Sequence, residues 1–300
     1  MDVIRHDKTY MCVVTKVYYD ACSDKRPPPS GDDTPLVHIR IFKQDNQADL
    51  PFKMPEISGP EGEVYANIYT RTWVSIVYDY YALGFNMKYA WGVSTKKVLE
   101  PFFNENFSRK HLDCGVATGY FPAVALARPF RADSKQHITL FDINPHTLRA
   151  AQSRILSVTS ATEVQCVEGD ATEPPPEVLK GVKYDSISMF NLFHCIPGGT
   201  GKLRAFATFK ELLSDDGVLT GCTVLGAKHA ANWFTKLYLR WYNWWQVLNN
   251  WDDNRDDFVD ALEQAFEEVE TWVIGTTLLF RARKPRKTNG ELLITLNDTV

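Results

Sequence analysis

The chain has 300 residues, which is enough for one large domain or two small ones with a substantial core. Its hydrophobic fraction of 44% and charged fraction of 23% are those of a globular protein, and a formal net charge of -4 argues against a nucleic-acid partner. No apolar run approaches the roughly 18 residues of a membrane-spanning helix and no signal peptide opens the sequence, so we expect a cytoplasmic protein with no membrane partner.

The cysteines show no metal-binding or redox spacing. The six are Cys12, Cys22, Cys114, Cys166, Cys195 and Cys222. No pair has the CxxC spacing of a zinc site or a redox dithiol, so we predict no bound metal.

The first 62 residues differ in composition from the rest of the chain. They contain two possible strands, residues 11–19 and 36–43, with Pro- and Gly-rich stretches between and after them. We predict an N-terminal extension, residues 1–62, with some β structure rather than a full domain.

Residues 64–99 are rich in aromatic side chains at helical spacing. Tyr65, Tyr69 and Trp73 recur four residues apart, which predicts one face of a helix. Such residues are typical of a helix packed on a core, and tyrosine and tryptophan are also common in the walls of ligand pockets. Both interpretations stay open.

From residue 111 onward, strand-like runs alternate with helical segments. Strands are predicted at 111–116, 137–143, 163–169, 186–193 and 218–225, helices at 121–127, 145–156, 202–213 and 256–266, and two closing strands at 268–275 and 276–283. The closing strands join at Gly275 as a hairpin, which makes one strand antiparallel. We therefore predict an α/β fold with a doubly wound, Rossmann-like, mainly parallel sheet of seven strands. This domain would span residues 63–284, with a tail at 285–300.

The segment HLDCGVATGYF, residues 111–121, carries the first of these strands into a glycine-containing turn. In a doubly wound sheet the ligand lies beyond the carboxyl ends of the strands, at the switch point of the strand order. The turn lacks the GxGxxG spacing of a dinucleotide site. Asp113 would repel a phosphate group and suits a cationic amino acid.

Later strands also end in polar residues. Asp142 ends the second strand, Asp170 follows the third, and Asn191 lies at the end of the fourth. A carboxylate after the second strand can accept hydrogen bonds from both ribose hydroxyls, and one after the third can bind the amine of adenine. With Asp113, these residues favour an adenosine ligand that carries an ammonium and a sulfonium group over NAD.

These motifs resemble the class I S-adenosylmethionine-dependent methyltransferases, and most closely a branch found among bacterial proteins and fungal secondary-metabolite enzymes. The resemblance covers about residues 65–283. HLDCGVATGYF is similar to that branch's HLDxGxGTGYF, and LFDINPHTLRAA, YDSISMFNLFHCIPG, LLSDDGVLTGCTVLG and LFRARK follow in the same order. One departure is Ala117, which stands in place of a glycine and adds a methyl group where the cofactor passes.

The resemblance implies S-adenosylmethionine as cofactor and assigns its contacts. The methionine part would be lined by Asp113, Gly115, Ala117, Gly119 and Tyr120. The ribose would be held by Asp142 with Ile143 and Asn144 beside it, the adenine reached by Asp170 and Ala171, and Asn191 would sit near the sulfonium. The alternative for Asp170 is a turn or a helix cap.

His194 follows the fourth strand and would face the methyl group. It is therefore the candidate general base for an acceptor that carries a proton. The alternative is a structural histidine that is hydrogen-bonded beneath the cofactor. The match of HCIPG to the family does not separate the two.

Residues 229–251 hold five of the eight tryptophans of the chain. They predict a helix that forms a lid over the cleft, packs on the core, or makes a homodimer interface. We predict a pocket for a bulky apolar small molecule, lined by Tyr69, Trp73, Tyr78, Tyr81, Trp91, His229, Trp233 and Trp241.

The sequence thus predicts methyl transfer from S-adenosylmethionine to a bulky, largely apolar small molecule of secondary metabolism, with S-adenosylhomocysteine as product. The alternative is a methyltransferase-like cyclase, pericyclase or isomerase that uses the bound cofactor as a fixed positive charge. Ala117 and the N-terminal extension favour that alternative. A binding protein with an inactive cleft is a third interpretation, and the retained acids Asp113, Asp142 and Asp170 argue against it.

Overall fold

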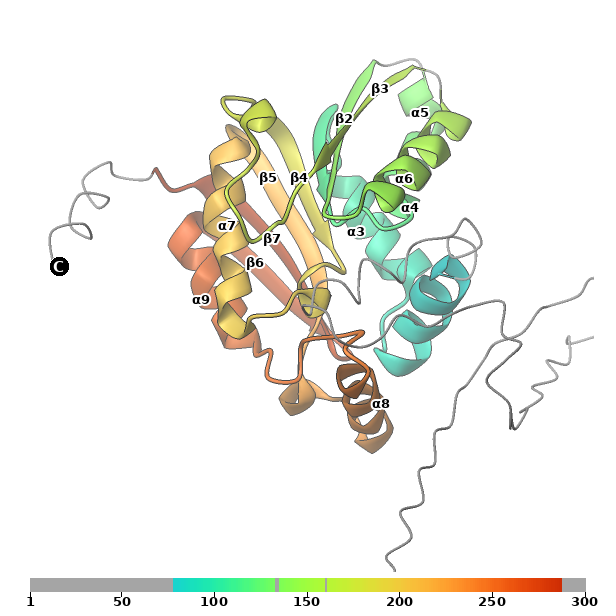
Figure 1. Ribbon diagram of the computed structural model, residues 1–300, viewed down its shortest axis with the longest axis vertical. Coiled ribbons are helices and arrows are strands. Elements are labelled where there is room, and N and C mark those ends of the chain that lie inside the picture. The colour runs from blue at the N-terminus through green and yellow to red at the C-terminus, as the bar shows by residue number, and fades with distance from the viewer. Residues whose placement is uncertain (1–77, 133–134, 160, 288–300) are drawn as a thin grey trace, which may run out of the picture. The chain divides into compact units, whose positions relative to one another are not determined.

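The computed structural model describes residues 78–132, 135–159 and 161–287 (Figure 1). The predicted extension at 1–62 with its two strands, and the predicted aromatic helix face at Tyr65, Tyr69 and Trp73, lie outside the described residues. So does the tail from residue 288 onward. Within the described part, no helix combines the length and the apolar character needed to cross a membrane.

The described chain alternates between strands and helices as predicted. The strands are β1 (Lys110–Cys114), β2 (Gln136–Asp142), β3 (Thr162–Glu168), β4 (Tyr184–Phe190), β5 (Leu213–Val224), β6 (Phe266–Ile274) and β7 (Thr277–Pro285). The α-helices are α3 (Glu100–Asn106), α4 (Tyr120–Leu126), α5 (Pro129–Ala132), α6 (Pro145–Val158), α7 (Arg204–Phe209), α8 (Trp233–Trp244) and α9 (Arg255–Ala265). Two π-helical segments, η1 (Asp79–Ala90) and η2 (Thr95–Leu99), precede α3, and short 3₁₀ turns are η3 (Glu177–Leu179), η4 (Phe193–Cys195), η5 (Gly199–Leu203), η6 (Lys210–Leu212) and η7 (Ala227–His229).

The seven strands form one sheet in the order β3-β2-β1-β4-β5-β7-β6. Neighbouring strands from β3 to β5 are parallel, whereas β7 is antiparallel to both β5 and β6. The predicted doubly wound sheet with one antiparallel strand is confirmed. The strand order changes direction between β1 and β4, and this is the switch point at which such folds bind ligands.

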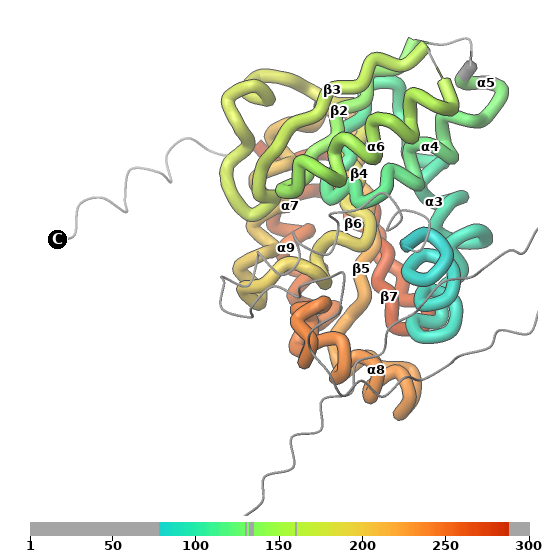
Figure 2. Tube along the Cα trace, turned by 45° about the vertical axis from the view of Figure 1, so that its right-hand side comes forward, coloured from blue at the N-terminus to red at the C-terminus, as the bar shows by residue number. Residues whose placement is uncertain are grey.

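The central strands β1, β2 and β4 are mostly buried because helices cover both faces of the sheet. In Figures 1 and 2, α3, α4 and α6 lie on one side of the sheet and α7 and α9 on the other. The consecutive residues Leu140 and Phe141 of β2 belong to different core clusters, and so do Leu279 and Phe280 of β7. Successive strand residues point to opposite faces, so a strand buried on both sides reads as a continuous apolar run.

Two predicted boundaries are wrong for local reasons. The fourth strand was expected to reach residue 193, but it ends at Phe190 because Asn191 has a φ of 56°, which a strand does not accommodate. The helix expected at 202–213 is α-helical only over α7, with 3₁₀ turns η5 and η6 on either side. Glycine is frequent in η5 and disfavours regular helix there.

A buried ion pair ties the segment after β4 to the segment before α9. The side chain of Lys202 is 1% exposed, and its Nζ lies 2.7 Å from Oδ2 of Asp253. The ammonium group also donates to the backbone carbonyls of Asn249 at 3.1 Å and Ile196 at 3.4 Å. These three acceptors match the three N–H donors of a lysine, so the buried charge is fully partnered.

We expect Asp253→Asn to destabilise the fold by about 3 kcal/mol, because it leaves the Lys202 ammonium buried without an anion. The matched control is Glu177→Gln, which removes the acid from the exposed Lys180–Glu177 pair and should cost less than about 1 kcal/mol. Urea unfolding of both variants measures the difference. Equal losses would contradict a structural role for the Lys202–Asp253 pair.

Candidate active site

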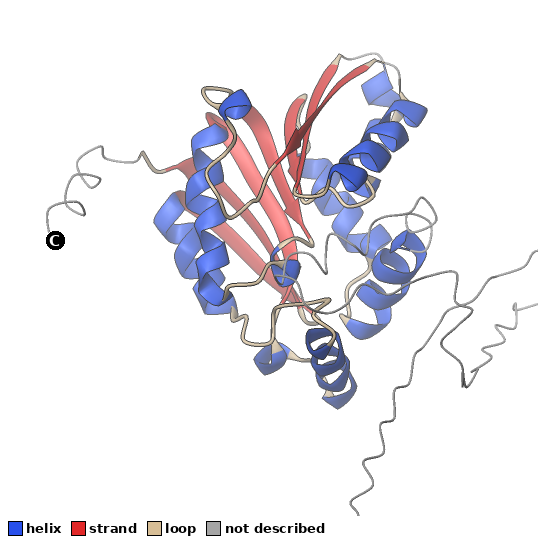
Figure 3. Ribbon diagram, in the orientation of Figure 1, coloured by secondary structure: helices blue, strands red, loops and turns tan. Residues whose placement is uncertain are grey.

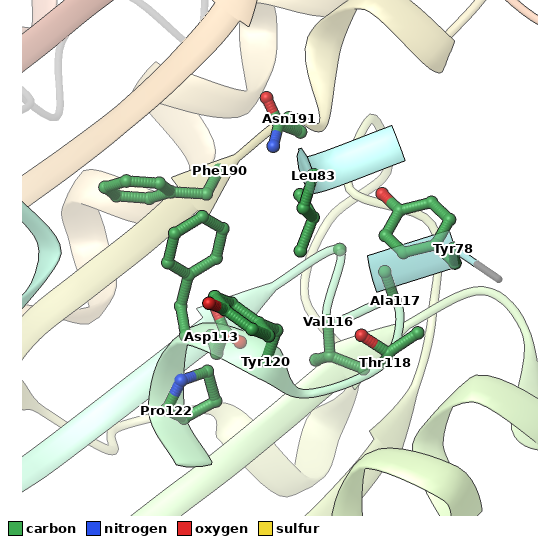
Figure 4. A pocket seen from close by; sticks show the side chains of 12 residues that line it. Tyr78, Leu83, Asp113, Val116, Ala117, Thr118, Tyr120, Pro122, Phe190 and Asn191 are labelled. Carbon is green, nitrogen blue, oxygen red and sulfur yellow. The ribbon is translucent and has the colours of Figure 1, made fainter. Parts of the chain in front are cut away.

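A pocket opens at the switch point, beyond the carboxyl ends of β1 and β4. The central strands point toward the end of the molecule where α8 lies (Figure 3). The pocket encloses about 300 Å³ of empty space, including its open mouth. Of the predicted cofactor residues, those that line it are Asp113, Gly115, Ala117, Tyr120 and Asn191, and Tyr78 of the predicted substrate wall joins them (Figure 4).

Other lining residues were not singled out from the sequence. They are Leu83, Val116, Thr118, Phe121, Pro122 and Phe190. Val116, Thr118 and Phe121 lie inside the HLDCGVATGYF segment, so their position in that segment was the available signal. Leu83 comes from η1 and faces the loop across the pocket (Figure 4), which only the tertiary fold reveals.

The loop after β1 owes its shape to left-handed backbone conformations. Gly115 has a φ of 74°, Ala117 of 45° and Gly119 of 66°. Glycine adopts such values freely, whereas an L-residue with a Cβ atom is strained there by about 1–2 kcal/mol. Ala117 therefore keeps the conformation that a glycine would have in this loop, with a methyl group added on the pocket wall.

Asp113 is a buried acid at the pocket, with 5% of its surface exposed. Burial raises the pKa of its carboxyl to about 7, a Ser188 hydrogen bond lowers that pKa, and the nearby Asp142 raises it. Within the described residues, none of the groups that shift this pKa is a cation. The carboxylate would therefore be stabilised by a positive charge that the described residues do not provide.

Asp142 ends β2 and faces the same loop. It is buried, and Oδ1 accepts the backbone N–H of Asn144 at 2.9 Å. Burial raises the pKa of Asp142, while hydrogen bonds from backbone groups including Ala117 and Val116 lower it. Asp142 therefore links the end of β2 to the loop after β1, although it does not line the pocket.

Two neighbours of Asp142 differ in their roles. Ile143 is exposed, so its side chain is accessible to a ligand. Asn144 is buried and caps α6, since its Oδ1 accepts the backbone N–H of His146 at 2.9 Å. The cap fixes the direction in which the chain leaves β2.

The predicted adenine residues lie apart from the pocket. Oδ1 of Asp170 accepts both the backbone N–H and the hydroxyl of Thr172 at 2.7 Å, which is the turn alternative considered above. Ala171 is buried in the core. Gly119, predicted for the methionine part, lies behind the pocket instead, where an added Cβ would come within 2.8 Å of Ala151 on α6.

His194 is buried and engaged with β5. The backbone N–H of Val224 donates to its Nδ1 at 3.2 Å, and Oγ1 of Thr223 lies 3.3 Å from the same atom. Burial, followed by the nearby Lys202 charge, lowers the pKa of His194 to about 3. The ring is therefore neutral, and it is absent from the pocket lining. This geometry favours the structural alternative over the general base.

A network that the sequence did not indicate joins η1 to the loop. The hydroxyl of Thr118 donates to Asp79 Oδ1 at 2.7 Å, and Arg154 of α6 lies 2.6 Å from Asp79 Oδ2. The Arg154 guanidinium also lies 5.2 Å above the ring of Tyr120, whose hydroxyl donates to Glu100 at 2.6 Å. These contacts hold η1, with Leu83, against the loop after β1.

Two predicted wall residues belong to a tyrosine cluster that joins η1 to α8. The hydroxyl oxygens of Tyr81 and Tyr238 are 2.8 Å apart, and Trp91 is buried with its ring 5.5 Å from that of Tyr238. Asn86 donates to the Tyr242 hydroxyl at 2.9 Å and accepts from Tyr238 at 3.0 Å. Neither Tyr81 nor Trp91 lines the pocket.

Tyr69 and Trp73 of the predicted wall lie outside the described residues, and the other three lie on or just before α8, which follows β5 in the chain (Figures 1 and 2). Trp233 is 78% exposed and Trp241 43% exposed, and they do not reach the pocket. His229 hydrogen-bonds to Asn254 Oδ1 at 2.8 Å. The structure thus places these three residues apart from the pocket at the switch point.

Comparison with known proteins identifies related chains. The methyltransferase domain family matches residues 112–219. O-methyltransferase NEC2 from Pyricularia oryzae is 51% identical, over 74% of this chain and 93% of that one. The physcion biosynthesis cluster O-methyltransferase from Aspergillus chevalieri is 38% identical, over 70% of this chain and 90% of that one. An O-methyltransferase family protein from Burkholderia thailandensis has a similar structure, with a TM-score of 0.52 and 14% identity over 74% of this chain and 63% of that chain.

The similarity to the Burkholderia structure concerns the fold alone. The similarity to the two fungal proteins is far closer in sequence and spans nearly their whole length. Together with the ordered motifs of residues 111–284 and the observed strand order, it identifies the chain's relatives without ambiguity. The chain belongs to the class I S-adenosylmethionine-dependent methyltransferase family.

Proposed function

We propose that the protein transfers the methyl group of S-adenosylmethionine to a hydroxyl oxygen of a small, largely apolar molecule of secondary metabolism. Methyl transfer from this cofactor follows from the family. The oxygen acceptor is supported by relatives named as O-methyltransferases, one of them assigned to the biosynthesis of physcion. Because these relatives are named for methyl transfer, the cyclase or isomerase alternative is not favoured.

The observation that carries the cofactor assignment is the buried carboxylate of Asp113. It lines the pocket, its pKa is raised by burial, and no cation of the described chain offsets its charge. The ammonium group of the methionine part would provide the missing charge, and charge-assisted hydrogen bonds of this kind are strong. The left-handed loop at Gly115 and Ala117 brings backbone close to the same space.

The other cofactor contacts follow from the strand ends. We assign the ribose to Asp142, which would exchange its backbone hydrogen bonds from the loop for ribose hydroxyls when the cofactor binds. Asn191, which lines the pocket directly after β4, would lie toward the sulfonium. Asp170 and Ala171 follow β3 and would lie toward the adenine, beyond the residues that line the pocket. The exposed Ile143 offers an apolar surface beside the ribose.

S-adenosylmethionine, when bound, supplies an electrophilic methyl group with a good leaving group. The residues of this chain have to orient the acceptor oxygen and exclude water, and such positioning lowers the barrier. The proton of the acceptor hydroxyl passes to the solvent as the oxygen–methyl bond replaces the sulfur–methyl bond. Tyr78, Leu83 and Phe190 give the pocket an apolar side suited to an aromatic acceptor. His194 is too deeply buried and too weakly basic to take the proton in the described geometry.

We expect Asp113→Asn and Asp142→Asn to separate the two ends of the cofactor. Asp113→Asn should weaken S-adenosylmethionine binding roughly 10- to 100-fold through the lost charge-assisted bond, yet leave 5′-methylthioadenosine, which lacks the amino-acid part, unaffected. Asp142→Asn should weaken both ligands, since both contain the ribose. Calorimetric titration measures all four affinities. An equal loss of affinity for both ligands with Asp113→Asn, or unchanged affinity for both with Asp142→Asn, would contradict the assignment.

The acceptor class can be tested with matched compounds. We expect a polycyclic phenol to gain the mass of one methylene unit when incubated with the protein and S-adenosylmethionine, with one S-adenosylhomocysteine formed per product. The matched aniline and thiophenol should stay unmodified. Mass spectrometry reports each product. Preferred methylation of nitrogen or sulfur would contradict the oxygen acceptor, and an isomerised product of unchanged mass would support the cyclase alternative.

We expect His194→Gln to keep turnover within about tenfold of the original protein, because glutamine can still accept the Val224 N–H that His194 accepts. His194→Ala should unfold at a lower urea concentration, since that buried N–H then loses its partner. Measuring kcat and urea midpoints for both variants separates the roles. A loss of about 100-fold or more in kcat for the glutamine variant would instead support a general base.

A further inference from the structure

A buried chain of hydrogen bonds runs along one face of the sheet, between β1 and β4, to Asp113. Strands β1 and β4 are paired in register, with His111 opposite Ser186 and Asp113 opposite Ser188. His111 Nδ1 lies 2.7 Å from Ser186 Oγ, and His111 Nε2 lies 2.9 Å from Ser188 Oγ. The Ser188 hydroxyl in turn donates to Asp113 Oδ1 at 2.5 Å. All four side chains are buried.

The groups at the two ends of this hydrogen-bonded chain determine which atom donates in each bond. The backbone N–H of Ser108 donates to Ser186 Oγ at 2.9 Å, so the Ser186 hydroxyl is free to donate to His111 Nδ1. An ionised Asp113 can only accept, so the Ser188 hydroxyl donates to it and must accept from Nε2–H of His111. One neutral tautomer of His111 satisfies every link.

We propose that His111 and Ser188 are positioning residues that hold the Asp113 carboxylate in the orientation and charge state that receives the ammonium group of the cofactor. This inference rests on the proposed role of Asp113 as the ammonium ligand. It assigns a function to two residues that touch neither cofactor nor acceptor. Each of the three side-chain links from Ser186 to Asp113 then has one donor and one acceptor, as a buried polar network requires.

The electrostatic surroundings explain why Asp113 needs such help. Burial and the facing Asp142 of β2 both favour the protonated acid, and they raise its pKa to about 7. His111 carries no charge that could offset them, because burial, together with the charge of Arg131, lowers its pKa to about 3. On its own strand the neighbouring Cys114 is a neutral thiol, since burial raises its pKa. Only the Ser188 hydrogen bond favours the carboxylate.

Losing the Ser188 hydrogen bond should lower the affinity for the cofactor and raise the number of protons released on binding. A group with a folded pKa near 7 is about half protonated at pH 7, and binding an ammonium group ionises it, so its proton passes to the buffer. Removing the Ser188 hydroxyl raises that pKa further. More of the free protein is then protonated at pH 7, more protons are released on binding, and the affinity is lower.

The test is calorimetric titration with S-adenosylmethionine at pH 7 in buffers of different ionisation enthalpy, which counts the protons released. The original protein should release about half a proton from Asp113. Ser188→Ala and His111→Phe should release more, and both should bind about tenfold more weakly. Phenylalanine suits position 111 because the rings of Phe103 and Phe107 already pack against the imidazole, at 5.5 Å and 4.6 Å.

Two further variants separate the possible failures. Tyr184→Phe removes another buried hydroxyl of β4, which donates to Thr139 at 2.9 Å and is not part of the chain to Asp113, and it should behave as the original protein. Asp113→Asn should release no proton from this site. If Asp113→Asn binds the cofactor as tightly as the original, the proposed function fails at this residue. If it binds weakly but Ser188→Ala or His111→Phe keeps the original proton count and affinity, only the positioning role is overturned.

Discussion

Asp113 places an ionisable carboxylate in a largely buried position at the pocket, where the described chain offers no cation to balance it. A buried charge without a partner costs several kcal/mol. A carboxyl group in this position therefore becomes protonated, or is ionised when a ligand with the opposite charge binds beside it. The switch of strand order makes the second outcome possible. Because the chain leaves β1 and β4 toward opposite faces of the sheet, a pocket remains open in front of the carboxylate.

Much of this arrangement could be predicted from the sequence because it depends on local patterns. Apolar runs with alternating helices predict a sheet covered on both faces, and polar residues after those runs predict a ligand at the carboxyl ends. The predictions fail where a single backbone conformation decides, as at Asn191, whose positive φ ends β4 three residues early. The residue type alone does not predict such a backbone conformation.

Other parts of the site depend on contacts between segments that are far apart in sequence. His111 and Ser188 meet because β1 and β4 are neighbouring strands paired in one register. No feature of residues 111–113 or 186–188 specifies that pairing in the sequence. The same holds for Asp79, which contacts the loop only through tertiary packing. For the aromatic residues of α8, the helix could be predicted from the sequence but the direction of its side chains could not. Their helical spacing was clear, but the rotation of the helix that leaves Trp233 exposed was not.

The segment η1 contacts both α8 and the loop after β1, and the two sets of contacts differ in strength. Between η1 and α8, the buried hydroxyl of Thr235 donates to the backbone carbonyl of Ala90 at 3.0 Å, and breaking this bond leaves buried polar groups without their partner. Between η1 and the loop after β1, Thr118 donates to Asp79, whose ion pair with Arg154 of α6 is partly exposed, with the Asp79 and Arg154 side chains 19% and 30% accessible. A partly solvated pair is worth less, on the order of 1 kcal/mol. If η1 moves to admit a ligand, it therefore separates more easily from the loop than from α8.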